Sequence, residues 1–286
     1  MRVATTAAEL DSALAEVRAS KQKISFVPTM GALHDGHLSL VEAAKDQGDF
    51  VVVSIFVNPL QFGAGEDFDR YPRTLEEDAK KLEGRADLLF APTVEVVYPS
   101  GQQSVTHQAG AVGETFEGAA RPGHFDGMLT VVARLFDLVK PDAAIFGAKD
   151  AQQIFLVRKM AERHYPSLEI ITAPTVREVS GMALSSRNRF LPGSAKPAAE
   201  QLIVALRAVE SAAKSGKRPS AAVQAGLAVL ANLPEAKLDY LAVVDPNSFE
   251  TVEENFIGEA LVLIAANVAQ TRLIDNIVIT FQEHSA

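Results

Sequence analysis

The sequence predicts an α/β fold, in which a mostly parallel sheet carries helices on both faces and a smaller α+β domain follows. Over the first 175 residues, strand-like apolar runs alternate with helix-like segments at the spacing of strand–helix–strand units. Beyond Pro174 the pattern changes to two alanine-rich helical segments and three strand-like runs. A chain of 286 residues is long enough for two domains, so we expect one over residues 1–175 and another over residues 176–286.

The strands of the first domain are predicted from short apolar, β-branched runs that stop at turn residues. Pro28 follows the first run, and Asn58-Pro59 follow the second. Strands with apolar residues throughout are typical of a sheet that is buried on both faces. The expected strands cover residues 24–27, 50–57, 88–90, 143–146 and 168–172.

The helices between these strands are predicted from apolar spacing and from charge order. Leu38, Val41 and Ala44 recur on one side of a helix over residues 38–45. A second helix begins at Thr74, with acidic residues in its first turn and lysines after them, as the helix dipole favours. Further helices are expected over residues 125–139 and 150–164.

The second domain is expected to combine helices and strands in separate blocks. Alanine-rich helices are predicted over residues 195–213 and 220–232, with a Gly-Lys-Arg-Pro turn between them. Strands are predicted over residues 238–244, 260–267 and 274–280.

Composition narrows the class of protein. The net charge of −9 disfavours a general RNA-binding role, although it allows a local basic pocket for an anionic small molecule. The chain has no cysteine, which excludes disulfides, thiolate metal sites and cysteine nucleophiles. The N-terminus has no apolar signal-peptide core, and no apolar run approaches the ~20 residues of a membrane-spanning helix. We therefore expect a cytoplasmic protein.

The first segment whose residues could bind a ligand joins the first strand to its helix and contains His34 and His37. Residues three apart project on one side of a helical turn, where unpaired N–H groups and the dipole favour an anion. We expect both rings to act as neutral hydrogen-bond donors, because the positive helix end disfavours the imidazolium form. Two exposed histidines beside a helix cap, or a metal pair lacking a third ligand, are the alternatives.

Three more segments carry polar groups suited to a ligand. Gln61, after the second strand, offers a donor and an acceptor for hydroxyls or a carboxylate. Lys149 can meet a phosphate as a point charge, and Asp150 can cap a helix, bind Mg²⁺ or hold a ribose. Ser185, with Ser186 and Arg187 after it, suits phosphate oxygens, although alone it reads as a polar loop.

His34-Asp35-Gly36-His37 resembles the His-x-Gly-His signature of the nucleotidyltransferase superfamily, which holds ATP phosphates with it. Six ordered motifs narrow the resemblance to the pantothenate synthetase (pantoate–β-alanine ligase) family. They are FVPTMGALH at 26–34, FVNPLQF at 56–62, YPRT at 71–74, RPGHF at 121–125, FGAKD at 146–150 and LSSRN at 184–188. The resemblance implies a Rossmann-like nucleotide-binding domain, with the smaller domain closing over the ATP site.

The resemblance also implies the reaction and its partners. The family condenses (R)-pantoate with β-alanine through a pantoyl adenylate, consuming ATP and releasing AMP and pyrophosphate. Mg²⁺ is expected to accompany ATP, and a homodimer is the expected assembly. Ala148 and Ala151 stand where many family members carry larger side chains, which affects the expected shape of the pocket.

The family resemblance assigns roles residue by residue. The expected catalytic residues are His37, His34, Lys149, Ser185 and Arg187. ATP contacts are expected from Met30, Gly31, His34, His37, Gly147, Lys149, Asp150, Val176, Leu184, Ser185, Ser186 and Arg187. Contacts with pantoate or β-alanine are expected from Gln61, Gln153, Asn58, Tyr71, Glu117 and Arg121, and Asp150 is the candidate metal ligand. Structural roles are expected for His107, His124, His164 and His284.

Two other functions remain open at this stage. An adenylyltransferase acting on a phosphorylated substrate would use the same histidines without needing Gln61 and Gln153 to meet an uncharged diol. An ATP-sensing module would keep the nucleotide loops and release no AMP. Exchange of pyrophosphate into ATP that depends on pantoate separates the ligase from both.

Overall fold

The chain divides into two units, residues 1–147 with 156–174 and residues 148–155 with 175–286. A computed structural model describes all residues except 64–65, 67, 100–103, 232, 234 and 284–286, so His284 falls outside the described part. Residues 148–155 precede the boundary expected at residue 175, yet they group with the second unit. This segment contains Lys149, Asp150 and Gln153.

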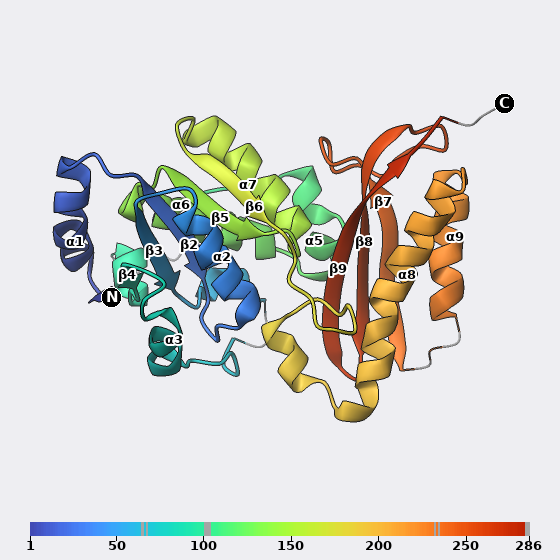
Figure 1. The fold of residues 1–286 in the computed structure, drawn as a ribbon, viewed down its shortest axis with the longest axis horizontal. Helices are drawn as coiled ribbons and strands as arrows, with labels where there is room; N and C mark the ends of the chain where they lie inside the picture. The colour runs from blue at the N-terminus through green and yellow to red at the C-terminus, as the bar shows by residue number, and fades with distance from the viewer. Residues whose placement is uncertain (64–65, 67, 100–103, 232, 234, 284–286) are drawn as a thin grey trace. The chain divides into compact units, whose positions relative to one another are not determined.

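The first unit is built on a six-stranded sheet with the order β1-β4-β3-β2-β5-β6 (Figure 1). Every neighbouring pair is parallel, which confirms the predicted sheet. From β2 the chain moves outward to β3 and β4, and it later continues with β5 on the other side of β2. Such a reversal of strand order is where open α/β sheets bind ligands. The strands are β1 (Arg2–Ala4), β2 (Ile24–Thr29), β3 (Phe50–Ile55), β4 (Leu88–Phe90), β5 (Ala143–Gly147) and β6 (Glu169–Ala173).

β2 extends past Pro28, where the sequence predicted its end. Pro28 has no N–H to donate, and pairing with β5 stops at Phe26, whereas the ladder to β3 continues to Thr29. A proline is therefore accommodated in this strand because one of its two ladders has already ended.

Helices cover both faces of this sheet. α2 (Asp35–Lys45) packs on the face that carries Val27 and Val53, and α6 (His124–Val139) brings Phe136 edge-on to Phe26. The other helical segments of this part are α1 (Ala7–Ala19), η1 (Pro59–Gln61), α3 (Leu75–Leu82), α4 (Val94–Val97), η3 (Ala111–Glu114), α5 (Glu117–Ala120) and α7 (Ala151–His164), whose first residues group with the second unit.

The sequence prediction omitted β1 and α1. The signal for α1 is present, because Thr6 accepts from the N–H of Glu9 while the Glu9 carboxylate accepts from the N–H of Thr6. This is a capping box, which Thr-x-x-Glu ahead of an apolar pattern indicates.

The second unit contains an antiparallel sheet in the order β7-β8-β9, with two long helices packed on it. Leu206 and Val209 of α8 share a core with Val262 and Ile264 of β8. The predicted α+β character is confirmed. The elements are η4 (Ser186–Phe190), η5 (Gly193–Ala195), α8 (Lys196–Lys214), α9 (Pro219–Leu230), β7 (Ala236–Val244), β8 (Gly258–Val268) and β9 (Thr271–Phe281).

Within the described residues, no helix is both long enough and apolar enough to cross a membrane.

Candidate active site

The loop after β2 has a conformation that few sequences allow. Gly31 has φ 82° and Ala32 has φ 51°, so two consecutive residues are left-handed. A Cβ on Gly31 would lie 3.0 Å from Cγ2 of Ile55 and 3.2 Å from Oδ2 of Asp78. Glycine is therefore required at position 31 by both its backbone angle and its neighbours.

Asp78 holds this loop in place. Its carboxylate is fully buried and accepts the N–H groups of Ala32 and Leu33, both at 2.8 Å, and the hydroxyl of Thr74 at 3.0 Å. Lys81 lies 3.9 Å from the same carboxylate and donates to the Leu33 carbonyl at 2.7 Å. Asp78 thus fixes the backbone that leads into His34, a role that the sequence analysis missed.

Replacing Asp78 with asparagine should destabilise the protein by roughly 1–3 kcal/mol, because an amide NH₂ would then face a buried backbone N–H. Catalysis should fall with it, since the loop carrying His34 loses its anchor. Chemical denaturation and initial rates test both effects. Glu76→Gln, an exposed change in the same turn of α3, is the matched control, and equal stability of the two variants would contradict the anchoring role.

His34 and His37 cap the start of α2 reciprocally. Nδ1 of His34 accepts the N–H of Gly36 at 3.2 Å, and Nδ1 of His37 accepts the N–H of His34 at 3.3 Å. A ring nitrogen that accepts carries no proton, so each neutral ring holds its proton on Nε2. The ring centroids lie 4.1 Å apart, and both imidazoles lie at the positive end of the helix. This arrangement supports the predicted role as neutral donors to an anion.

Gln61 meets the histidine loop at the edge where β2 and β3 end. Its amide nitrogen donates to the thioether of Met30 at 3.0 Å, which confirms that the two predicted segments come together. Its amide oxygen accepts from Nδ2 of Asn58 at 3.1 Å. The orientation of the Gln61 amide is thus set by two partners, and its N–H side faces the histidine loop.

The side-chain amide of Asn58 makes all of its hydrogen bonds to groups of the protein itself. The side chain is 1% exposed, and its oxygen accepts from the hydroxyl of Tyr98 and from the N–H of Leu60. Its nitrogen donates to Gln61 and to the carbonyl of Gly127. Because these four bonds use both amide hydrogens and both oxygen lone pairs, we interpret Asn58 as orienting Gln61 rather than contacting substrate. No motif in the sequence indicates that Tyr98 belongs to this network.

Gly127 allows α6 to approach this loop closely. A Cβ there would lie 2.1 Å from the carbonyl oxygen of Leu60 and 2.8 Å from the N–H nitrogen of Gln61. Any larger residue would therefore push α6 away from the segment that carries Gln61.

Arg121 and His124 form a second network behind Gln61. Arg121 makes a bidentate pair with Glu66 at 3.0 and 2.6 Å, and it approaches Nε2 of His124 at 3.0 Å. Since arginine can only donate, Nε2 of His124 accepts, and its Nδ1–H donates to the Gln61 carbonyl at 2.9 Å. His124 therefore contacts the candidate site, whereas the sequence analysis assigned it only a structural role.

Burial and the neighbouring Arg121 lower the pKa of His124 to about 4. The folded state prefers the neutral ring, so its stabilising contribution is complete above pH 6.5 and is lost as the pH falls from 6.5 toward 4. Between pH 7 and 5 this loss is roughly 2 kcal/mol.

An NMR titration of the ring protons should show His124 still neutral at pH 5. His164, at the end of α7, is the internal comparison within the same spectrum. A midpoint for His124 near 6.5 would contradict the arrangement of donors and acceptors around its ring.

Two other candidates lie near these networks. The Tyr71 ring is buried and packs edge-on against Phe62, with centroids 5.9 Å apart. Glu117 is buried at the start of α5.

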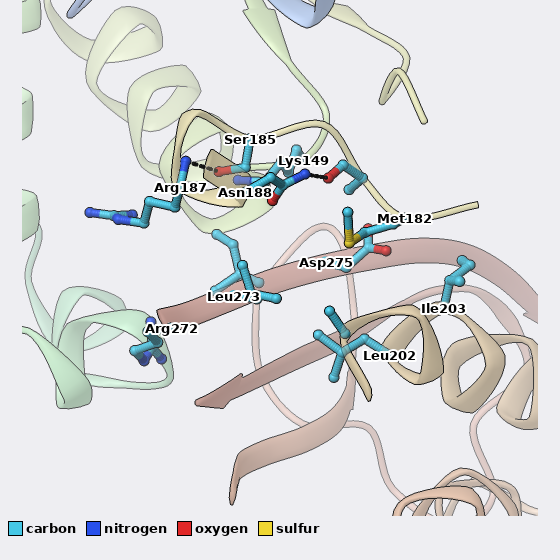
Figure 2. Close-up of a pocket in the computed structure, with 13 residues that line it drawn as sticks. Lys149, Met182, Ser185, Arg187, Asn188, Leu202, Ile203, Arg272, Leu273 and Asp275 are labelled. Carbon is cyan, nitrogen blue, oxygen red and sulfur yellow. Dashed lines mark hydrogen bonds between the residues drawn. The ribbon is translucent and has the colours of Figure 1, made fainter. Parts of the chain in front are cut away.

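The second unit brings together the predicted phosphate-binding residues. Lys149, Ser185 and Arg187 line one pocket, with apolar side chains of α8 and β9 on its other side (Figure 2). The Ser185 hydroxyl accepts the N–H of Arg187 at 3.2 Å, which caps η4. Ser186 is the first residue of η4. The lining also includes Arg272, which pairs with Asp239, and the Asp275 carboxylate, which pairs with Arg177. The predicted lysine, arginine and serine in this lining suit an anionic ligand.

The remaining predicted residues have these positions. The Val176 carbonyl accepts the N–H of Leu184 at 2.9 Å, which closes the turn ahead of Ser185. Gly147 ends β5, and Gln153 is half-buried in the first turn of α7. The Asp150 carboxylate lies 3.8 Å from the Lys149 ammonium. Proximity between the histidine pair and Lys149 stays a prediction, because they belong to different units.

Comparison with known proteins gives one consistent result. Residues 2–278 match the family model described as pantoate-beta-alanine ligase. The pantothenate synthetase of Leifsonia xyli is 54% identical over 90% of this chain and 89% of its own length, and that of Acidothermus cellulolyticus is 50% identical over 96% and 90%.

Solved structures agree with these sequence matches. Pantothenate synthetase from Thermus thermophilus superposes with a TM-score of 0.91, at 46% identity over 97% of this chain and 99% of that one. The pantoate-beta-alanine ligase of Francisella tularensis, described as a complex with beta-gamma ATP and beta-alanine, gives 0.78 at 34% identity, covering 97% of each chain.

Proposed function

The chain belongs to the pantoate–β-alanine ligase family, and we propose that it condenses (R)-pantoate with β-alanine in an ATP-dependent reaction. The products are pantothenate, AMP and pyrophosphate. The observation that carries the proposal is the reciprocal histidine cap, which favours a proton on Nε2 of both rings at the positive end of α2. This helix follows β2, the strand beside which the strand order of the sheet reverses. Gln61, fixed beside it, supplies an uncharged polar group for pantoate.

The reaction proceeds in two steps. In the first, a carboxylate oxygen of pantoate bonds to the α-phosphorus of ATP while the bond to the β-phosphate oxygen breaks and pyrophosphate leaves. In the second, the neutral amine of β-alanine attacks the acyl carbon, AMP leaves, and the nitrogen loses its extra proton to solvent. Adenylation is needed because a carboxylate alone has no good leaving group.

We assign the protein's contribution mainly to positioning and charge neutralisation. His34 and His37 donate to phosphate oxygens, and His37 is the donor to the charge that develops at the transferred phosphate. Lys149, Ser185 and Arg187 hold the remaining phosphate oxygens. The expected contacts of Met30, Gly31, Gly147, Val176, Leu184 and Ser186 complete the ATP site.

Pantoate recognition follows from the orientation of Gln61. Because the Gln61 oxygen accepts from Asn58, the amide presents N–H to the hydroxyl or carboxylate oxygens of pantoate. Gln153 is the second amide proposed for this substrate. Arg121 and Glu117 are proposed on the β-alanine or pyrophosphate side, and Tyr71 as a weaker contact.

We propose that Mg²⁺ binds as a companion of ATP. Among the described residues, no group of three or more His, Asp or Glu side chains could hold a metal ion. Asp150, next to Lys149, offers one carboxylate, and Mg²⁺ in such enzymes takes one or two carboxylates together with substrate phosphates. When bound, the ion neutralises phosphate charge.

Three further expectations extend this proposal. The second unit closes over ATP, because the acyl adenylate must be kept from water. A homodimer is proposed from the family resemblance, and light scattering would measure it. A cytoplasmic location is proposed because the reaction consumes ATP.

Exchange of labelled pyrophosphate into ATP tests the proposed function. Exchange should require pantoate, and adding β-alanine should release AMP in equal amount to pantothenate. Exchange that requires a phosphoester instead would favour an adenylyltransferase. Saturable ATP binding with no AMP released would favour an ATP sensor.

A further inference from the structure

We propose that Asn276 is a positioning residue that sets the place of Lys149 at the phosphates. The inference rests on the proposed role of Lys149 in ATP binding. It assigns a function to β9, more than a hundred residues further along the chain, where the sequence analysis predicted only a strand.

Asn276 holds the peptide groups on both sides of the Lys149 Cα. Its Nδ2 donates to the carbonyl of Ala148 at 2.9 Å and to the carbonyl of Lys149 at 2.8 Å. The side chain is 7% exposed. An amide nitrogen has two hydrogens, and both are directed at consecutive carbonyls, so the turn that carries Lys149 is fixed at two adjacent points.

Asn276 is itself held rigidly. It lies within β9, paired with β8 on an antiparallel ladder that runs from Thr271 to Phe281. Its N–H donates to the Asp275 carboxylate at 2.8 Å. A flexible side chain such as that of lysine needs a fixed Cα to deliver its charge to one place, and β9 supplies that reference.

Asp275, the neighbour of Asn276 on β9, holds the turn that leads into Ser185. Its buried carboxylate pairs with both terminal nitrogens of Arg177, at 2.6 and 2.9 Å. Arg177 also donates to the carbonyls of Gly181 and Asn276. Arg177 and Gly181 belong to the turn that leads directly into Ser185.

Adjacent residues of one strand therefore anchor both segments that line the pocket in Figure 2. Asn276 holds the backbone of Lys149, and Asp275 holds Arg177 in the turn that leads into Ser185. The second unit thus holds the backbone of Lys149 and the turn ahead of Ser185 through neighbouring residues of one strand before any ligand binds. Arg177 and Asp275 maintain the anchor, and Asn276 connects it to Lys149.

Asn276→Asp tests this role with almost no change in size. A carboxylate cannot donate, so it would set negative charge against two carbonyl oxygens, and the turn should shift. We expect the dissociation constant for ATP, measured by calorimetry, to rise on the order of tenfold. Asn247→Asp makes the same chemical change in an exposed turn of the second unit and should leave ATP affinity unchanged.

A double-mutant cycle separates positioning from general damage. Lys149→Met should weaken ATP binding strongly in the wild-type background and much less in the Asn276→Asp background, because the charge is already misplaced there. His37→Asn should cost the same factor in both backgrounds. Additive effects of Asn276→Asp and Lys149→Met would overturn the inference, although the proposed function would stand. A null effect of Lys149→Met alone would instead contradict the proposed role of Lys149.

Asn276→Ala provides a second variant if the aspartate does not fold. It removes both hydrogen bonds without adding charge and should show the same non-additivity with Lys149→Met. In the wild-type protein, the Asn276 side-chain amide protons should exchange slowly with solvent in an NMR experiment. Fast exchange of those protons would overturn the inference without any variant.

Discussion

Replacing His37 with asparagine should slow pantoate-dependent pyrophosphate exchange on the order of 10²–10³-fold. Asparagine can place its amide oxygen near the position of Nδ1 and keep the bond from the N–H of His34. It has no group at the position of Nε2, so the donor to the phosphate is lost. The helix cap, and therefore the stability of the protein, should be retained.

His37→Gln should have the opposite effect, because it keeps a donor near the position of Nε2 and loses the helix cap. Its longer side chain can return an N–H near the position of Nε2, while the bond to the N–H of His34 is lost. We expect more activity than in the asparagine variant and a stability loss of about 1 kcal/mol. His164→Asn is the control for a histidine outside the site, and initial exchange rates with denaturation curves measure all three. Exchange by His37→Asn at the wild-type rate would remove the catalytic role of His37.

Lys149→Met should also reduce the rate of pyrophosphate exchange strongly. Methionine keeps much of the length and apolar character of the lysine stem and removes the ammonium of a residue that lines the pocket. We expect exchange to fall on the order of 10²-fold or more, because preorganised charge at a transferring phosphate contributes that much. The KM for ATP should rise as well, since the same charge binds the ground-state phosphates.

Lys149→Arg should recover little of this activity. A planar guanidinium cannot take the place of a compact ammonium at a site built around a single point charge. Lys214→Met, which removes an exposed lysine of α8, is the control within the same unit and should have normal kinetics. Full activity in Lys149→Arg would mean that the pocket requires only a positive charge, not its position.

The parallel sheet could be predicted from the sequence because its strands are short apolar runs that end in turn residues. The helices were predicted to within a few residues where apolar spacing was regular. α2 begins earlier than predicted, at Asp35, because His34 acts as its N-cap, and histidine is not a usual capping residue. β1 is only three residues long at the sheet edge, too short to give a periodic signal.

The positioning residues could not be predicted, because their partners are distant in sequence. Asp78 contacts the loop 46 residues before it, and Asn276 contacts Lys149 127 residues before it. In the sequence each is one polar residue within a helix or a strand. Likewise, Asn58 resembles a substrate contact until the four hydrogen bonds of its amide are seen.

The histidine cap is formed by a single short stretch of the sequence. Both rings receive their proton arrangement from backbone groups of residues 34 and 36, within one turn of α2. The two hydrogen bonds that favour this tautomer therefore lie within four consecutive amino acids. A helix that begins with this tetrapeptide in the same conformation would favour the ring proton on Nε2 in both histidines. The rest of the protein, including the Asp78 anchor, determines where that pair lies.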